Sequence, residues 1–525
     1  MEEQKTSDQP APERPSNYLD SPIAKSRWFQ ITVIAVLLIG TAIAFVYYRY
    51  SPSAVASVKT SGSVSTVKSI AVLPLRPLNS ESGDEYLELG MADALITKLS
   101  GLKEMVVRPT SSIRKYAGEE QDATAIGRQL QVESVLEGNV QKAGNRLRIT
   151  VQLVNVADGS PMWAGKFDEE LTDIFKVQDD VSERVVDALA LQLTGEERKS
   201  LAKRYTGNLE AYKLYLRGRY FWDKRSKDDL LKAIEYFNQA IAVDPNYALA
   251  YAGLALCYGP LGYQGYMSPG EGRPKMIAAA SKALELDDSL AEAHAAMGSA
   301  KAFYEWDWEQ AEHEFKRAIE LNPSYPTAYQ WYGLYLEAMG HQDENLAARN
   351  RALEIEPFNL SINSGVGMVY YYTGQYDRAV DILQKTLELD PNFAQARFYL
   401  GLTYVQKGKF DEAIAEFNKA MTLSGSLARA KANTANAYAL SGKRKEAQKI
   451  LEELRELSKK EYVSPEDIAL IYMGLGDKER TLDWLEKAYD EGDPVLNHIK
   501  VEPQFAGLHS EPRFQAILKR MRLSN

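Results

Sequence analysis

The sequence predicts a multi-domain protein: a single transmembrane helix, then a small α/β domain, then an all-α solenoid of paired helices. Three observations predict this order. Residues 28–48 contain no charged side chain. Residues 69–194 mix short apolar runs with helical patterns. Further along the chain, prolines that follow an acidic residue or Asn recur at an interval of 34 residues.

Composition narrows the classes of function. The chain has 525 residues, 45% of them hydrophobic and 26% charged, with a formal net charge of −10. An acidic chain of this kind is not expected to bind nucleic acid directly, because such proteins usually carry a basic surface. Cys257 is the only cysteine, which excludes an intramolecular disulfide and any metal site built from several cysteines.

The charge-free run 28–48, WFQITVIAVLLIGTAIAFVYY, is long enough to cross a bilayer. At ~1.5 Å per residue it spans roughly 30 Å. Trp28 and Tyr48 stand at its ends, where aromatic rings prefer the headgroup region. We expect a retained anchor. A cleaved signal peptide, with Ala54-Val55-Ala56 as the cleavage site, and a buried core helix are the alternatives.

Polar segments flank this run. Residues 1–27 are rich in Pro, Ser and Glu and predict a disordered tail, and residues 49–68 predict a linker. Basic side chains are equally frequent on the two sides of the span, so the positive-inside rule does not decide its orientation. These side chains are Arg14, Lys25 and Arg27 before it, and Arg49, Lys59 and Lys68 after it.

Residues 69–194 predict one compact α/β domain. SIAVLPL, from Ser69, and MVVRP, from Met105, are short apolar runs typical of strands. Residues 90–100 place apolar side chains on one helical face, and residues 149–156 alternate as a half-buried strand does. Residues 171–193 predict a long amphipathic helix.

Five runs in this domain resemble the TolB amino-terminal-like domain: IAVLPL, YLELGMADALITKLS, VESVLEGNV, RLRITVQLVNVADGSPMWAGKFD and DIFKVQDDVSERVVDAL. That domain recurs in bacterial signalling proteins, typically between a membrane span and tetratricopeptide repeats. The resemblance implies a bacterial inner-membrane protein that crosses the membrane once, with its C-terminal domains in the periplasm. It implies no catalytic residue and no cofactor.

Residues 208–494 predict about eight tetratricopeptide units, each of two antiparallel helices. Pro323, Pro357 and Pro391 are 34 residues apart, and Pro245 precedes them by 78 residues. Small residues recur where helices approach, among them Gly333, Gly367, Gly401, Ala379 and Ala413, and large ones such as Phe315 and Phe417 fill the gaps between. Residues 495–525 predict a capping helix region that carries Lys519, Arg520 and Arg522.

No complete catalytic or metal-binding motif is present, so we expect a protein that is not an enzyme and has no cofactor or metal. Cys257 is expected in the core, and His294 and His313 lack further ligands for zinc. The acidic run that starts at Glu305 predicts a solvated helix face. An enzyme built on Glu85, Glu88 and Asp93 is the remaining alternative.

The resemblance extends to membrane regulators of the CadC type, in which a winged-helix domain precedes the span; in other relatives a protein kinase domain does. Only 27 polar residues stand before the span here, too few for either. We therefore expect the output domain to lie on another protein.

The predicted function is that of a membrane-anchored adaptor that binds a protein or peptide partner in the groove of the repeats, in envelope signalling or assembly. The alternative is a cytosolic-facing membrane scaffold, or an accessory subunit of a transcription-regulator or nucleotide-cyclase system. The repeat period predicts that six residues line the groove: Gln330, Glu337, Tyr371, Tyr372, Phe398 and Asn436. The two tyrosines are favoured because large aromatic side chains commonly anchor interfaces.

Overall fold

The computed structural model describes residues 67–78, 85–117, 122–144, 146–170, 174–424 and 427–523. The predicted tail, the predicted transmembrane helix and nearly all of the predicted linker lie outside these residues. Among the helices that are described, none has the length and apolar character needed to cross a membrane. Residues 66–525 form one compact unit, to which the following description applies.

The first part of this unit is an α/β domain. Its strands are β1 (Ser69–Val72), β2 (Arg76–Pro77), β3 (Val106–Val107), β4 (Ser134–Ala143), β5 (Arg146–Asn155) and β6 (Pro161–Glu170). Its helices are α2 (Glu85–Leu99), α3 (Thr110–Ile113), η2 (Arg114–Tyr116), α4 (Ala123–Gln129), α5 (Ile174–Ala188) and α6 (Gly195–Leu201).

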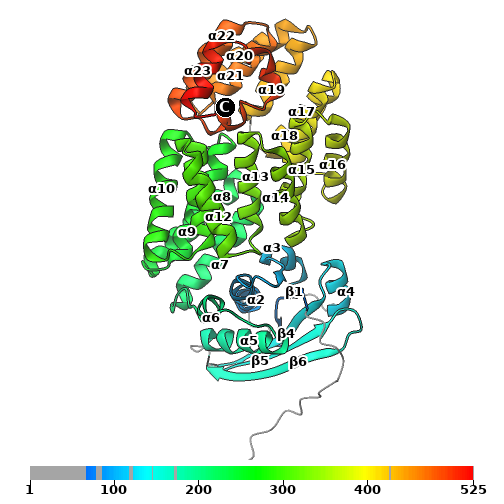
Figure 1. Ribbon diagram of the computed structural model, residues 1–525, viewed down its shortest axis with the longest axis vertical. Coiled ribbons are helices and arrows are strands. Elements are labelled where there is room, and N and C mark those ends of the chain that lie inside the picture. Colours follow the sequence, from blue (N-terminus) through cyan, green and yellow to red (C-terminus); the bar gives the residue numbers. More distant parts are fainter. Residues whose placement is uncertain are drawn as a thin grey trace, which may run out of the picture. The chain divides into compact units, whose positions relative to one another are not determined.

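The sheet order is β3-β1-β4-β5-β6, with β2 paired to β4. β1 runs parallel to β3 and β4, whereas β4, β5 and β6 form an antiparallel meander. β5 alternates between buried and exposed residues, as the sequence predicts. Helices α2 and α5 pack beside the sheet (Figure 1). The predicted helix over 171–193 is shorter than expected, because Ala190 adopts a left-handed φ of 53° just after α5.

The second part is a row of helix pairs. In chain order these are α7 (Leu209–Lys224) with α8 (Lys227–Val243), α9 (Ala248–Tyr263) with α10 (Pro269–Leu286), α11 (Ala291–Ala300) with α12 (Trp308–Leu321), α13 (Pro326–Met339) with α14 (Gln342–Ile355), α15 (Leu360–Tyr372) with α16 (Tyr376–Leu389), α17 (Ala394–Gln406) with α18 (Phe410–Ser424), α19 (Leu427–Leu440) with α20 (Arg444–Leu457), and α21 (Pro465–Gly474) with α22 (Lys478–Glu491). A π-helical turn, η4 (Lys301–Glu305), extends α11. Figure 1 shows neighbouring helices side by side along this row.

Small residues let the paired helices approach closely. At Gly401 on α17, an added Cβ would lie 2.5 Å from Cε1 of Phe417 on α18. Gly367 on α15 stands in the same relation to Leu383 on α16, 2.9 Å from its Cγ. The small-against-large pattern of the sequence is therefore a real packing contact at these positions.

Residues 494–523 form what we call the C-terminal segment. It contains η5 (Pro494–His498), η6 (Pro503–Leu508) and α23 (Pro512–Arg520). Part of it packs on the last helix pair, as a cap is expected to: Arg520 forms an ion pair with Asp490 at 2.7 Å. The remainder turns back to earlier pairs, where the indole Nε1 of Trp308 donates to the carbonyl oxygen of Met521 at 2.7 Å. The sequence pattern does not predict this return.

The α/β domain contacts the C-terminal end of α14 and the turn before α13. Arg108, just after β3, donates to the carbonyl oxygens of Glu354 and Ile355, the latter at 2.7 Å. The hydroxyl of Ser324 donates to the carbonyl oxygen of Met105 at 3.2 Å. Ser324, Glu354 and Ile355 lie within three residues of the recurring prolines Pro323 and Pro357, so the repeat period also places the polar groups that meet the α/β domain.

Gly401→Ala is expected to lower the thermal unfolding midpoint of the protein. The new methyl group meets the ring of Phe417, and overpacking of this kind costs ~1–3 kcal/mol. Gly270→Ala is the control, because no atom lies within 4 Å of the Cβ at that position of α10. It is expected to keep or raise the midpoint, since alanine favours a helix. An equal loss in both variants, measured by circular dichroism, would contradict the packing argument.

Candidate functional site

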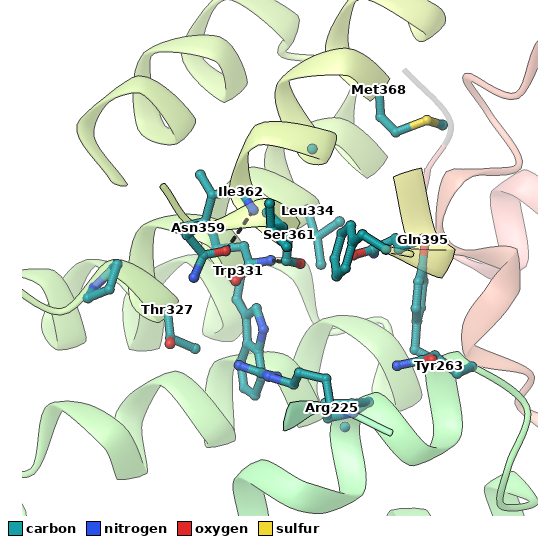
Figure 2. A pocket seen from close by; sticks show the side chains of 18 of the residues that line it. Arg225, Tyr263, Thr327, Trp331, Leu334, Asn359, Ser361, Ile362, Met368 and Gln395 are labelled. Atoms are coloured by element: carbon teal, nitrogen blue, oxygen red, sulfur yellow. Dashed lines mark hydrogen bonds between the residues drawn. The ribbon is translucent and has the colours of Figure 1, made fainter. Parts of the chain in front are cut away.

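A cavity of about 770 Å³ lies along the inner face of the helix pairs (Figure 2). First helices of five units contribute to its wall: Tyr263 on α9, Trp331 on α13, Tyr372 on α15, Phe398 on α17 and Arg429 on α19. The period of the repeats brings these side chains together, because each first helix presents the same face to the inside. The cavity is thus formed by several stacked helix pairs together and not by a single unit.

The α/β domain and the C-terminal segment complete the wall. Pro109, Thr110 and Ser111 of the α/β domain line one part, and His498 and Glu502 of the C-terminal segment line another. The cavity is therefore bounded by all the described parts of the chain. It has a size typical of small-ligand sites, which are about 300–1,000 Å³.

Four of the six predicted groove residues line this cavity: Gln330, Glu337, Tyr372 and Phe398. The side-chain amide of Gln330 donates to the hydroxyl of Ser361 at 2.8 Å. The guanidinium carbon of Arg429 lies over the ring of Phe398, 5.5 Å from the ring centroid. A partner-binding role for these residues stays a prediction.

The other two predicted residues, Tyr371 and Asn436, contact the C-terminal segment. The hydroxyl of Tyr371 donates to Glu502 Oε1 at 2.6 Å, and Asn436 Nδ2 donates to Gln504 Oε1 at 2.6 Å. Both side chains are buried. The expectation of an open groove at these two positions therefore needs correction, because the chain's own C-terminal segment covers them.

A buried ion pair stands in the cavity wall. Glu337 lies 3.1 Å from Arg349, and both side chains are at most 4% exposed. Nε of Arg349 also donates a hydrogen bond to Oδ1 of Asn345 at 2.7 Å. Burial raises the pKa of Glu337 to about 7, and the charge of Arg349 opposes the rise only in part. Glu337 therefore titrates near neutral pH in the folded protein.

Three of the chemistry-bearing residues that the sequence singled out, His294, Cys257 and Asp93, have hydrogen-bond partners in the structure. Among the described residues, no group of three His, Cys, Asp or Glu is arranged to hold a metal ion. His294 contacts Glu314 at 2.5 Å through Nδ1 and the carbonyl oxygen of Asp288 at 2.8 Å through Nε2. Cys257 is buried, its thiol donates to the carbonyl oxygen of Gly253 at 3.3 Å, and burial raises its pKa. Asp93 accepts a hydrogen bond from Thr110 at 2.7 Å.

Comparison with known families assigns two parts of the chain. Residues 367–428 and 224–247 match tetratricopeptide-repeat families, so the predicted repeats are confirmed. Residues 66–184 match the family described as the second domain of HilA/YgeH-like transcriptional regulators. A HilA-like regulator domain is therefore present where the sequence predicts the α/β domain.

One curated relative is named putative adenylate cyclase 3 of Rhizobium meliloti (strain 1021). It is 34% identical over 188 residues, which make up 36% of this chain. The matched region spans about a third (32%) of the length of that relative.

Several solved structures show a partial similarity to the chain. The chain of Pseudomonas aeruginosa PilF is 20% identical, covers 41% of this chain and 94% of its own, and has a TM-score of 0.32. PilW, a type IV pilus biogenesis factor, is 19% identical over 42% of this chain and 96% of its own, with a TM-score of 0.34. A chain of the APC/C hetero-tetramer Cut9–Hcn1 is 17% identical, over 66% of this chain and 63% of its own length, with a TM-score of 0.42. At these scores we draw no functional conclusion from them.

The raised pKa of Glu337 predicts a pH-dependent stability. Its folded pKa of about 7 exceeds the unfolded value of 4.5, so the folded state holds the extra proton between these values. The stabilisation is complete below pH ~4.5 and is lost as the pH rises through 7. From this group alone, we expect the free energy of unfolding to fall by up to about 3 kcal/mol between pH 5 and pH 8.

Thermal melts of the wild type and Glu337→Gln at pH 5 and pH 8 test this expectation. The difference between the two pH values should be smaller in the variant, which cannot titrate at this position. The same difference in both proteins would contradict the assignment.

Proposed function

We propose that this protein is an adaptor that binds a protein or peptide partner through its tetratricopeptide repeats, as part of a bacterial envelope signalling or assembly system. Tetratricopeptide-repeat proteins are protein-interaction adaptors, and the repeats are present here. The observation that carries the proposal is the lined inner face, to which the first helices of five units contribute aromatic or arginine side chains. Clustered aromatic and arginine side chains are the residue types enriched at interface hot spots.

Residues 28–48 anchor the adaptor in the inner membrane in this proposal, with the C-terminal domains in the periplasm. The length and charge-free character of that run support the anchor. The proposal also retains the resemblance of the α/β domain to the TolB amino-terminal-like domain and the resemblance to CadC-type membrane regulators.

An accessory role in a transcription-regulator or nucleotide-cyclase system is the second candidate. Two separate comparisons favour it: the match of residues 66–184 to a domain of transcriptional regulators, and the relative named as a putative adenylate cyclase. In this version the α/β domain and repeats receive or transmit a signal, and a separate protein carries the output. The two candidates share the adaptor function and differ in the partner.

A photo-crosslinking amino acid in the cavity wall tests the adaptor function. We expect p-benzoylphenylalanine at Phe398 to give a discrete adduct with another protein in cells, because this side chain faces the cavity. The control position is Lys385, which is exposed on α16 and pairs only with Asp381 on the same helix. Adducts within the chain alone, or the same adducts from both positions, would contradict a partner on the inner face.

Reporter fusions after Asn525 test the membrane topology. A reporter active only outside the cytoplasm is expected to be active, and one active only in the cytoplasm to be silent. The opposite result, with both fusions intact, would place the repeats in the cytoplasm and favour the scaffold or accessory-subunit alternative.

A further inference from the structure

One backbone position recurs in the repeats with a left-handed conformation. It is the residue between the two helices of a pair, immediately before the residue that caps the second helix. Glycine occupies it in five consecutive pairs, always with a positive φ between 68° and 85°: Gly340, Gly374, Gly408, Gly442 and Gly476. Glycine suits this conformation because it has no Cβ to clash with the backbone.

Two pairs carry a large residue at this position. Trp306, 34 residues before Gly340, has a φ of 48°, and Arg225, between α7 and α8, has a φ of 62°. A non-glycine residue in this conformation costs ~1–2 kcal/mol. Each of these residues therefore needs a compensating role for its side chain.

The structure shows the role of Trp306. Its indole Nε1 donates to Oδ1 of Asn497 at 2.9 Å, and its ring stacks on Tyr489 with 4.7 Å between centroids. Trp306 thus holds the C-terminal segment in place.

Arg225 has no comparable partner. It is one of the residues that line the cavity, and its guanidinium lies 3.6 Å from the ring centroid of Trp222. Within the described part of the chain, Arg225 forms no side-chain hydrogen bond and no ion pair within 4 Å. Burial lowers the pKa of this guanidinium, while the charge of Asp223 opposes the shift. An arginine side chain nevertheless stays charged in proteins.

The carboxylates that act on Arg225 are engaged with other groups. Asp223 forms an ion pair with Arg114 at 2.9 Å. Glu356 accepts hydrogen bonds from Ser111 and from Asn359, the latter at 2.9 Å. The five donors of the Arg225 guanidinium are thus available to a ligand. The N–H donors of a guanidinium are arranged in a planar fork whose geometry matches carboxylate and phosphate groups.

The rest of the lining suits a flat apolar body. Trp222, Tyr263, Trp331 and Leu334 line the cavity with Arg225. In Figure 2, Arg225 and Tyr263 stand on one side, Asn359 and Ser361 stand on the other, and Trp331 lies between them. We propose that the cavity binds a small organic anion with an aromatic body, and that Arg225 binds its carboxylate or phosphate group. This site goes beyond the partner-binding function and does not depend on it.

The test compares two probes of the same shape, 2-naphthoate and its neutral counterpart 2-naphthamide. Calorimetric titration uses the full chain in nanodiscs of neutral lipid, with empty nanodiscs as the blank. We expect the wild type to bind 2-naphthoate about tenfold more tightly than 2-naphthamide, as a charge-assisted hydrogen bond provides. Arg225→Gly is expected to abolish this preference and leave the affinity for 2-naphthamide unchanged.

Stability separates this role from a structural one. Arg225→Gly is expected to keep or raise the thermal unfolding midpoint, because glycine relieves the left-handed strain. Trp306→Gly is expected to lower it, because that side chain holds the C-terminal segment. Arg317→Gln removes an equal charge from an exposed pair with Glu320 and is expected to keep the preference for 2-naphthoate.

Three results would overturn the proposal. They are a wild-type protein that binds neither probe, equal affinity of the wild type for both probes, and a preference for 2-naphthoate that persists in Arg225→Gly. None of these results would bear on the crosslinking outcome at Phe398, so failure of this site is distinguishable from failure of the adaptor function.

Discussion

The return of the C-terminal segment onto earlier helix pairs is the contact on which the rest of the site depends. A row of stacked helix pairs leaves its inner face and both ends uncovered. Here Leu496, Ile499, Phe505 and Leu508 of the C-terminal segment are buried in the same hydrophobic core as α9, α11 and α13. Burial of each such side chain stabilises by about 1.5–3 kcal/mol. Hydrophobic burial therefore drives the closure, and the cavity is the space that the segment leaves unfilled.

Polar contacts fix the position of the C-terminal segment on the helix pairs. Trp306 and Tyr371 reach the C-terminal segment from two different helix pairs, through Asn497 and Glu502. Burial raises the pKa of Glu502, while the hydrogen bond from Tyr371 opposes the rise. At the other side, Tyr212 of α7 donates to the carbonyl oxygen of Gly90 at 2.5 Å and fixes the α/β domain against the first pair. The C-terminal segment and the α/β domain are thus both attached to the helix pairs by specific hydrogen bonds as well as by apolar packing.

The repeats could be predicted from the sequence because their contacts are local. Gly401 and Phe417 lie 16 residues apart in one unit, and the same spacing recurs in others, so the period shows which side chains meet. The four cavity-lining residues among the six predicted ones follow from the same period. Tyr371 and Asn436 were misplaced because their partners, Glu502 and Gln504, lie 131 and 68 residues away in sequence. A contact at that distance has no periodic signal.

Arg225 was missed although a signal existed. Glycines recur every 34 residues from Gly340 to Gly476, and Trp306 falls in the same series. A residue that interrupts a glycine series is a candidate for function, because the backbone conformation makes it costly. The insertions in the first two units hide Arg225 from a simple period, and the structure was needed to align it.

Hydrogen exchange of the full chain tests the closure most directly. The backbone amides of Leu496 and Ile499 donate to the carbonyl oxygens of Asp493 and Leu496, within a segment that is buried only because it lies on the inner face. The account predicts that these amides exchange as slowly as those of α13, against which the segment packs. Rapid exchange in residues 494–508 beside slow exchange in α13 would show an inner face that stands open, and would contradict the closed arrangement.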